Sequence, residues 1–456
     1  MNIFINMKKI LLLFCLLQIA VLFLFYPEFY GISDEDLYLT TAYSFQHGTL
    51  FYEENIGSSF FVKVNNRAFS LYPPGNSLLL LPFTSIHWRL GFLKNILLYI
   101  GSFLLFLLIL RRFNIEPIYS LFFLFHPTLV LFSRTLMSDI PSMFFLLLGI
   151  FLMLNKKSVA AGFSLGFLLL LRYPNLIIIV GILVVLLYEK EYKKTLLLFP
   201  GVIFFSLLLL IYILYTSGSL LVPFSYGKGF FGIRNLLYNF PYYFISLNIL
   251  YPGLLLGILI FRIKDKRFSL FIAPALILIV FYSFYYYIHE GNNIIEKLVK
   301  GQRFFIPIIP FMLIPYLDFL HNKDLVRKVF VFAVSLLFVF NCVIQYKHQQ
   351  LLKERNRLSK ILNNETENSD ILICNKDGDK LVNPHFNKAK YIELSEINEY
   401  YLDSLRNKFN VSFVFVEIER RDDLGKKSKW VEYFEREGFI ISYESQEPVP
   451  IVIMTE

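Results

Sequence analysis

Apolar runs of about 20 residues recur along most of this 456-residue chain. A helix of that length crosses the hydrocarbon core of a bilayer, because it rises about 1.5 Å per residue through a layer of about 30 Å. Charged residues make up 17% of the chain, against about 25% in soluble domains, which excludes an ordinary water-soluble protein. The sequence therefore predicts an all-α bundle that crosses the membrane many times.

Eleven spans are predicted, and clusters of Lys and Arg occupy every second connecting loop, beginning with Lys8-Lys9. Such clusters stay on the cytoplasmic side, so the acidic loop after the first span is expected outside. Lys8-Lys9 and the run after them have the charge and core of a signal peptide, but no small-residue cleavage site follows, so we expect an uncleaved first helix. The predicted spans are 10–26, 92–110, 117–132, 140–154, 158–171, 175–188, 195–215, 243–261, 268–287, 304–320 and 329–346.

The composition divides the chain into two predicted domains. Residues 1–346 form the transmembrane domain, which includes a large first outer loop at 27–91. Residues 347–456 predict a small α/β domain on the outer side, because short apolar strands alternate with helical segments at 396–408 and 430–437. Its strands are expected at 371–374, 411–418, 440–443 and 451–454.

An acidic run, Asp34-Glu35-Asp36, follows the first span directly. At the centre of a spanning helix each carboxylate would cost roughly 2.5–3.5 kcal/mol, so the run belongs in a loop, in the interface or in a wet cavity. One interpretation is a general base whose neighbours hold a cation or an acceptor group. The other is a solvated helix cap beginning at Ser33-Asp34. The residues that follow predict a short amphipathic helix on the membrane surface, with Leu37, Thr41 and Phe45 on one face.

Three further sites combine charge with a position at the outer ends of spans. Arg134 and Asp139 share a short outer turn, where they would pair with each other or Asp139 would join the site of Asp34. A third possibility is that Asp139, which precedes Ile140-Pro141, simply starts the next helix. Arg172 interrupts two apolar stretches and needs water or a partner, either Asp139, Glu35 or a phosphate. Arg303, with Lys300 before it, suits phosphate binding, although a cation snorkelling to head groups is more frequent in general.

Metal and nucleic-acid partners have little support in the sequence. His289-Glu290, with Asp36, are weak candidates for a divalent metal, and an interfacial histidine is the more common situation. No other cofactor is indicated. The net charge of +9 does not indicate nucleic acid, because the basic residues fall in short clusters between apolar runs.

Five motifs follow one another in the first 320 residues, and the ordered set is more specific than any single member. In chain order they are Asp34-Glu35-Asp36-Leu37-Tyr38, Pro73-Pro74, Asp139, Leu170-Leu171-Arg172-Tyr173-Pro174 and Arg303-Phe304-Phe305-Ile306-Pro307. In this set and its order the chain resembles the GT-C superfamily of polytopic membrane glycosyltransferases, especially the protein mannosyltransferases and the aminoarabinose transferases of lipid A. Some relatives carry a charged pair before the double proline, where this chain has Leu71-Tyr72.

The resemblance implies an inverting transfer of a sugar from a polyprenyl-phosphate donor to an acceptor hydroxyl on the outer side. Asp34 would be the general base. Asp139, the second residue assigned to the catalytic site, would occupy the family's second acidic position, which helps to position the acceptor or a metal. The resemblance also implies a lipid-linked sugar donor, membrane lipid, and a protein, lipid or glycan acceptor as partners. The short cytoplasmic loops and the Lys-rich start of the chain suit a bacterial inner membrane. The implied substrate- or phosphate-binding residues are Glu35, Tyr38, Arg134, Arg172, Lys300 and Arg303.

Two other classes of function remain as alternatives. One is a transporter or flippase for an amphipathic substrate, which would more often show internal pseudo-symmetry that this chain lacks. The other is an O-antigen polymerase or ligase, in which the key outer loop usually comes late in the chain, whereas the acidic loop here is early.

Overall fold

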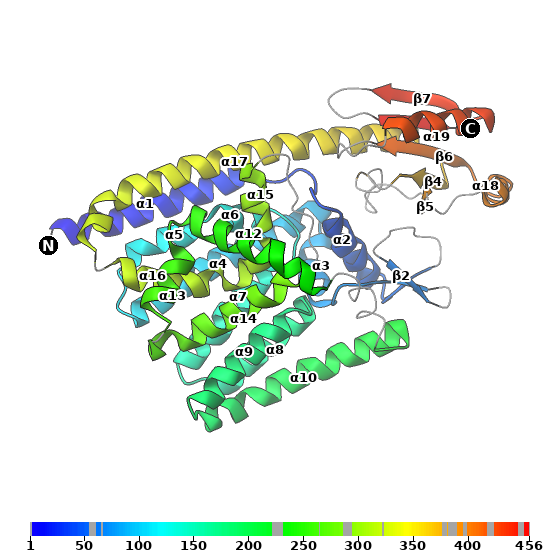
Figure 1. Ribbon diagram of the computed structural model, residues 1–456. Helices are drawn as coiled ribbons and strands as arrows, with labels where there is room; N and C mark the ends of the chain where they lie inside the picture. The colour runs from blue at the N-terminus through cyan, green and yellow to red at the C-terminus, as the bar shows by residue number, and fades with distance from the viewer. Residues whose placement is uncertain are drawn as a thin grey trace. The chain divides into compact units, whose positions relative to one another are not determined.

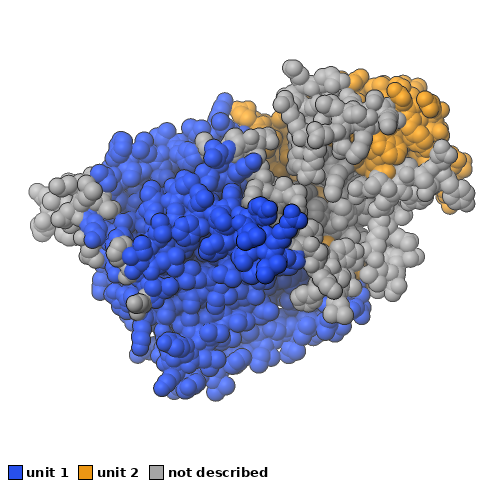
Figure 2. Space-filling view, in the orientation of Figure 1, with its two compact units in different colours: residues 1–26, 72–79, 92–348 blue, residues 27–71, 80–91, 349–456 orange. Residues whose placement is uncertain are grey.

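The computed structural model of the chain divides into two compact units (Figure 2). Unit 1 comprises residues 1–26, 72–79 and 92–348, and unit 2 comprises residues 27–71, 80–91 and 349–456. The units thus divide the chain differently from the predicted domains, because most of the first outer loop belongs with the C-terminal segment. The structure describes residues 2–53, 61–64, 67–220, 231–263, 265–285, 294–321, 323–375, 381, 390–394, 399–416, 424–445 and 451–455.

Unit 1 is a bundle of helices built from the predicted apolar runs (Figure 1). Its longer helices are α1 (Asn2–Leu24), α4 (Gly91–Arg112), α7 (Asp139–Leu154), α8 (Ser158–Leu171), α9 (Asn175–Tyr188), α10 (Tyr192–Ser217), α12 (Ile233–Leu250), α13 (Leu254–Phe261), α14 (Ser269–Ser283), α15 (Ile294–Gly301), α16 (Ile309–Leu320) and the first part of α17 (Asp324–Glu365). Its shorter helices are η2 (Pro117–Ser120), α5 (Leu121–Leu124), α6 (Pro127–Phe132), η3 (Lys266–Phe268) and η4 (Arg303–Ile308).

The predicted spans coincide with helical segments, but not all of these reach spanning length. Among the described residues, six helices are long and apolar enough to cross a membrane, and seven if α12 and α13, which meet at 100°, form one broken span. Helices α7, α8 and α9 are apolar but shorter. The segment predicted at 117–132 is divided into η2, α5 and α6. The protein is therefore a multi-pass membrane protein, and the number of eleven crossings stays a prediction.

Helices α1 and α17 run parallel along one side of the bundle (Figure 1). The ring centroids of Phe14 and Phe338 lie 6.1 Å apart, and those of Phe25 and Tyr346 lie 6.4 Å apart. Residue numbers therefore increase in the same direction along both helices. Both N-terminal ends, each with one of the basic clusters of the sequence, lie at the same end of the bundle, as the charge pattern predicts.

The closest helix packing in the bundle joins α8 and α10. A side chain at Gly201 would overlap the backbone of Gly162 and Phe163, and one at Gly166 would overlap the carbonyl of Gly201. Small residues at such spacing let two helix backbones approach closely within a membrane, where dispersion and not the hydrophobic effect holds helices together.

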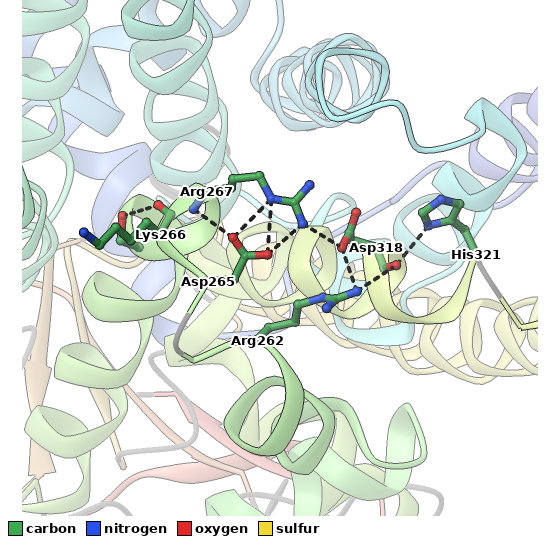
Figure 3. A network of polar contacts seen from close by, with 7 residues as sticks. Arg262, Asp265, Lys266, Arg267, Asp318 and His321 are labelled. Carbon is green, nitrogen blue, oxygen red and sulfur yellow. Dashed lines mark hydrogen bonds and ion pairs between the residues drawn. The ribbon is translucent and has the colours of Figure 1, made fainter.

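A polar network ties the connection between α13 and α14 to the end of α16 (Figure 3). The Arg262 guanidinium lies 2.8 Å from the Asp318 carboxylate, and Arg267 lies 2.7 Å from Asp265 and 3.7 Å from Asp318. The hydrogen bond from the Arg267 side chain holds the pKa of Asp265 below its ordinary value. His321 Nδ1 lies 3.0 Å from the backbone oxygen of Asp318. The network neutralises cations in a loop of the predicted cytoplasmic set.

Unit 2 contains a five-stranded sheet in the order β5-β4-β6-β8-β7. Strands β4 and β5 pair parallel, as do β4 and β6, whereas β8 pairs antiparallel with β6 and β7. The four predicted strands correspond to β4, β6, β7 and β8, and β5 is an additional one. The elements are β4 (Ile371–Cys374), β5 (Lys390–Glu393), α18 (Glu399–Arg406), β6 (Val411–Val416), α19 (Leu424–Arg436), β7 (Ile440–Ser445) and β8 (Ile451–Thr455).

Alternate residues of the sheet build a separate apolar core on each face. Ile371 and Ile373 share one core with Phe434 of α19, and Leu372 shares the other with Leu358 and Leu362 of α17. Successive strand residues point to opposite faces, so a short run such as β4 serves both cores. The last turns of α17 are thus part of the sheet's packing.

The rest of unit 2 comes from the first outer loop. It contains α2 (Ser33–Gln46), a small antiparallel sheet in the order β1-β3-β2, the end of α3 (Gly75–Thr84) and η1 (Trp88–Leu90). The small sheet consists of β1 (Tyr52–Glu53), β2 (Phe61–Val64) and β3 (Arg67–Ser70). Gln46 donates from Nε2 to the Thr84 hydroxyl at 2.7 Å, which ties the end of α2 to α3.

Candidate active site

The acidic run opens helix α2 in unit 2. The N–H groups of Gly31 and Ile32 both donate to Glu35 Oε2, at 2.8 and 2.9 Å. Glu35 therefore closes the first turn of the helix from its third position, the role of the acidic member of a capping box. The sequence had assigned Glu35 to substrate binding; in the structure one of its oxygens holds the helix start.

Asp34 and Asp36 flank this cap and are both 8% exposed. Tyr38 is also buried. Every residue from 34 to 42 is buried, so α2 has no open polar face. The prediction of an amphipathic helix lying on the membrane surface is therefore wrong. Within unit 2, α2 contacts β3, and the Gln46–Thr84 bond ties its last residue to α3.

The second acid, Asp139, forms a buried charge cluster in unit 1. Its carboxylate is fully buried at the first residue of α7, where it pairs with Arg172 Nη1. The Nε atom of Arg303 lies 3.7 Å from the other carboxylate oxygen. We call Asp139, Arg172 and Arg303 the arginine–aspartate cluster. Two guanidinium groups and one carboxylate leave it with a net charge of +1.

Aromatic rings surround the two guanidinium groups of the cluster. The Arg172 guanidinium carbon lies 5.7 Å from the centroid of the Phe304 ring, and that of Arg303 lies 5.8 Å from it. Phe132 lies 6.0 Å from Arg303, and Tyr282 stacks on Phe304 at 4.6 Å. Ring faces attract cations, so these contacts lower the cost of keeping two arginines away from water.

The chain positions Arg172 at a helix break. Arg172 ends α8 in an extended conformation, with φ −156° and ψ 134°. Asn175 donates from Nδ2 to the Leu168 carbonyl and to the Ser142 hydroxyl, both at 2.9 Å. These bonds satisfy a carbonyl of the last turn of α8 and tie it to α7, which carries Asp139. The extended Arg172 is therefore held beside the acid.

A buried lysine and two asparagines, which the sequence analysis missed, hold the turn before Asp139. Asn76 donates to the Leu136 carbonyl at 2.8 Å, and Asn95 donates to the carbonyls of Thr135 and Met137 at 2.6 and 2.8 Å. Lys94 donates from Nζ to Asn76 Oδ1 at 2.5 Å and is 2% exposed. A lysine inside the predicted apolar span 92–110 is the sequence signal that would have drawn attention to this turn.

The glycine of the motif Pro73-Pro74-Gly75 is required by helix packing. A Cβ atom at Gly75 would lie 2.5 Å from the Leu170 carbonyl oxygen, so only glycine lets the start of α3 approach the end of α8. Leu170 lies two residues before Arg172, and Asn76, next to Gly75, binds the turn before Asp139. The motif thus braces both sides of the arginine–aspartate cluster within unit 1.

Two solved structures have a fold similar to that of this chain, and both are crystal structures of ArnT from Cupriavidus metallidurans. The TM-score is 0.65 for ArnT bound to undecaprenyl phosphate and 0.67 for ArnT in the apo state. Each match is 11% identical and covers 98% of this chain and 98% of the other. The chain has the fold of ArnT. The GT-C resemblance is thereby confirmed for the fold. No protein-family model matches the chain, and no curated protein matches it by sequence.

Arg134 does not join the cluster beside Asp139. It is fully buried, and it donates to the Phe25 carbonyl from Nε at 3.0 Å and from Nη2. Its Nη1 lies 3.3 Å from the Gln345 carbonyl and 3.2 Å from His348 Nδ1. In the structure Arg134 therefore joins the end of α1 to α17. Phe25 follows the last residue of α1, so the cation at its carbonyl also complements the dipole of that helix.

The structure thus assembles part of the predicted site. It brings Asp139, Arg172 and Arg303 together in unit 1, whereas Asp34, Glu35, Asp36 and Tyr38 belong to unit 2. Lys300 is half-buried near the end of α15. The metal candidates His289 and Glu290 lie outside the described residues. Within the described part of the chain, no three His, Cys, Asp or Glu side chains are grouped to hold a metal ion.

Proposed function

We propose that the protein is a membrane glycosyltransferase that moves a sugar from a polyprenyl-phosphate donor to an acceptor hydroxyl. The ordered motifs and the ArnT fold support this class, and one of the two ArnT structures contains undecaprenyl phosphate. The observation that carries the proposal is the buried arginine–aspartate cluster, whose net positive charge suits one phosphate group. Guanidinium is the side chain best shaped to bind phosphate oxygens in pairs.

The proposed reaction breaks the bond between the anomeric carbon and the donor's phosphate oxygen. The acceptor oxygen forms the new bond from the opposite face of the sugar, so the configuration inverts. Asp34 takes the proton of the acceptor hydroxyl, and the leaving polyprenyl phosphate keeps the bonding electron pair. Arg172 and Arg303 stabilise the negative charge that develops on that phosphate. Asp139 holds the two arginines in position and sets the charge between them.

We place the reaction on the outer side of a bacterial inner membrane. The charge pattern of the short loops and the parallel course of α1 and α17 support this orientation. In sequence, α1 leads directly into residues 27–71 and α17 continues into residues 349–456, and both segments belong to unit 2. The acidic helix α2 and the five-stranded sheet are therefore proposed to share one side of the membrane. The acceptor is a protein, a lipid or a glycan.

One observation favours a transporter for a lipid-linked glycan instead. Helices α12 and α13 meet at 100°, and broken helices often line substrate paths in transporters. The two functions differ in outcome, because a transporter moves its lipid unchanged between the leaflets, whereas a transferase releases free polyprenyl phosphate.

The test is sugar transfer in proteoliposomes with a polyprenyl-phosphate sugar as donor. Asp34→Asn should stay folded and lose transfer by on the order of 10²–10⁴-fold, the usual contribution of a general base. Asp403→Asn, an exposed carboxylate on α18, is the matched control and should transfer normally. Undiminished transfer by Asp34→Asn would contradict the base assignment. Passage of the lipid between leaflets without release of polyprenyl phosphate would favour the transporter.

A further inference from the structure

The peptide group that precedes helix α2 is held from both sides. Its N–H side is fixed because Gly31 and Ile32 donate to the Glu35 carboxylate. Its carbonyl side is fixed because Gly31 O accepts a hydrogen bond from Arg355 Nη1. Asp34 lies one turn from this clamp. The position of the clamp therefore determines where helix α2 begins and, with it, where the Asp34 side chain lies.

Arg355 comes from the other end of the chain, near the C-terminal end of α17. The arginine is 6% exposed, in spite of its charge. A buried guanidinium is costly unless it is hydrogen-bonded, so its bond to Gly31 is more than a surface contact. Hydrogen bonds that involve a charged donor are about twice as strong as neutral ones.

The segment of α17 around Arg355 is fixed to the five-stranded sheet. Leu358 and Leu362 are fully buried in the core on one face of the sheet. Ser359 donates to the Leu381 carbonyl at 2.7 Å. The sheet therefore fixes the last turns of α17, and these turns fix the start of α2 through Arg355. All of these residues belong to unit 2.

We propose that Arg355 is a positioning residue for Asp34, and that the C-terminal sheet serves the reaction by holding this arginine in place. The inference rests on the proposed role of Asp34 as general base. The inference gives the C-terminal segment a function. That segment keeps Asp34, on helix α2 of the first outer loop, in the orientation that proton transfer needs. A misplacement of about 1 Å in a catalytic group costs on the order of 100-fold in rate.

Arg357 supplies a matched control two residues further along the same helix. Its side chain is 48% exposed and pairs with Glu354 at 2.6 Å. Arg355→Gln and Arg357→Gln remove the same charge from the same turn of α17, and only the first removes the bond to Gly31. Arg355→Lys keeps a cationic donor that can reach the carbonyl, so it should restore part of the activity.

The first readout is steady-state transfer from a polyprenyl-phosphate sugar by the full-length protein in proteoliposomes. Arg355→Gln should lower kcat by about 10- to 100-fold and leave KM for the donor within about twofold, because the donor's phosphate site is unchanged. Arg357→Gln should match the unaltered protein. An unchanged kcat in Arg355→Gln would overturn the inference, and so would an equal loss in both variants.

The second readout does not depend on activity. Amide hydrogen exchange should become faster at residues 31–36 in Arg355→Gln, while the central strand β6 stays protected, which shows that the sheet remains folded. Equal protection at residues 31–36 in both proteins would overturn the inference. If the unaltered protein transfers no sugar, the proposed function fails, and the exchange measurement still decides whether Arg355 orders the start of α2.

Discussion

Replacing Arg303 by Gln tests the charge of the arginine–aspartate cluster. The substitution changes the net charge from +1 to zero and leaves Asp139 paired with Arg172, so the cluster remains internally neutral. Hydrogen bonds to charged groups contribute about 1.5–3 kcal/mol each, and the Arg303 side chain is only 10% exposed, so solvent screens it little. At 1.4 kcal/mol for each factor of ten, the dissociation constant for polyprenyl phosphate should rise by about 10- to 150-fold.

In the assay, undecaprenyl phosphate is titrated into the purified protein in nanodiscs, and its binding is measured from the change in the temperature of thermal unfolding. Arg267→Gln is the control, because Arg267 also pairs with an acid in unit 1 but its side chain is 59% exposed. Its affinity for the lipid should stay within about 0.5 kcal/mol of the unaltered protein. An affinity for Arg303→Gln equal to that of the control would refute the phosphate assignment.

Asp139→Asn should act in the opposite direction on binding. It leaves two buried cations without their carboxylate, so the free energy of unfolding should fall by about 3–5 kcal/mol, while a phosphate that supplies the missing negative charge should bind more tightly. The unfolding temperature of this variant should therefore rise steeply with added lipid, and that of Arg303→Gln hardly at all. The same direction of change in both variants would show that the cluster is a structural ion pair only.

Two further predictions concern helix packing and product release. Gly201→Val should destabilise the bundle by more than about 3 kcal/mol, because its side chain would overlap the backbone of Gly162 and Phe163 on α8; retention of the normal unfolding temperature would contradict the close approach. Inhibition by added polyprenyl phosphate should strengthen as the pH rises through about 6, where a phosphate monoester gains its second charge, and a flat dependence in initial-rate measurements would count against the cluster as its site.

The apolar pattern of the sequence predicted most helix positions, because a spanning helix needs a long local run of apolar residues. The strands β4, β6, β7 and β8 were also predictable, since each contains a short apolar run, and β4, β6 and β8 are buried along most of their length. The number of membrane crossings was harder to predict from the sequence. Helices such as α7 and α9 are shorter than a full span, and the segment at 117–132 is broken near Pro127.

The sequence identified Asp139, Arg172 and Arg303 as candidate site residues. It did not predict which arginines would lie beside Asp139. Arg134 lies closer to Asp139 in sequence than Arg172 does, and yet it binds the end of α1. Nothing in the local sequence distinguishes the two arginines, because the choice depends on carbonyls 109 and 211 residues away from Arg134. The same holds for Lys94, whose partner Asn76 lies 18 residues earlier in another helix. Buried polar contacts of this kind follow from tertiary packing.

The charge of the cluster also explains why it contains an acid. The proposed donor is a phosphodiester with one negative charge, which a cluster of charge +1 neutralises. The leaving phosphate gains charge as the sugar departs, so the cluster binds it more strongly in the transition state than in the donor, and only such a difference accelerates the reaction. Two arginines without Asp139 would carry +2 and would favour the fully charged product, which slows its release. Because Asp139 already accepts from Arg172, it is better suited to setting this charge than to taking a proton, which leaves Asp34 as the base.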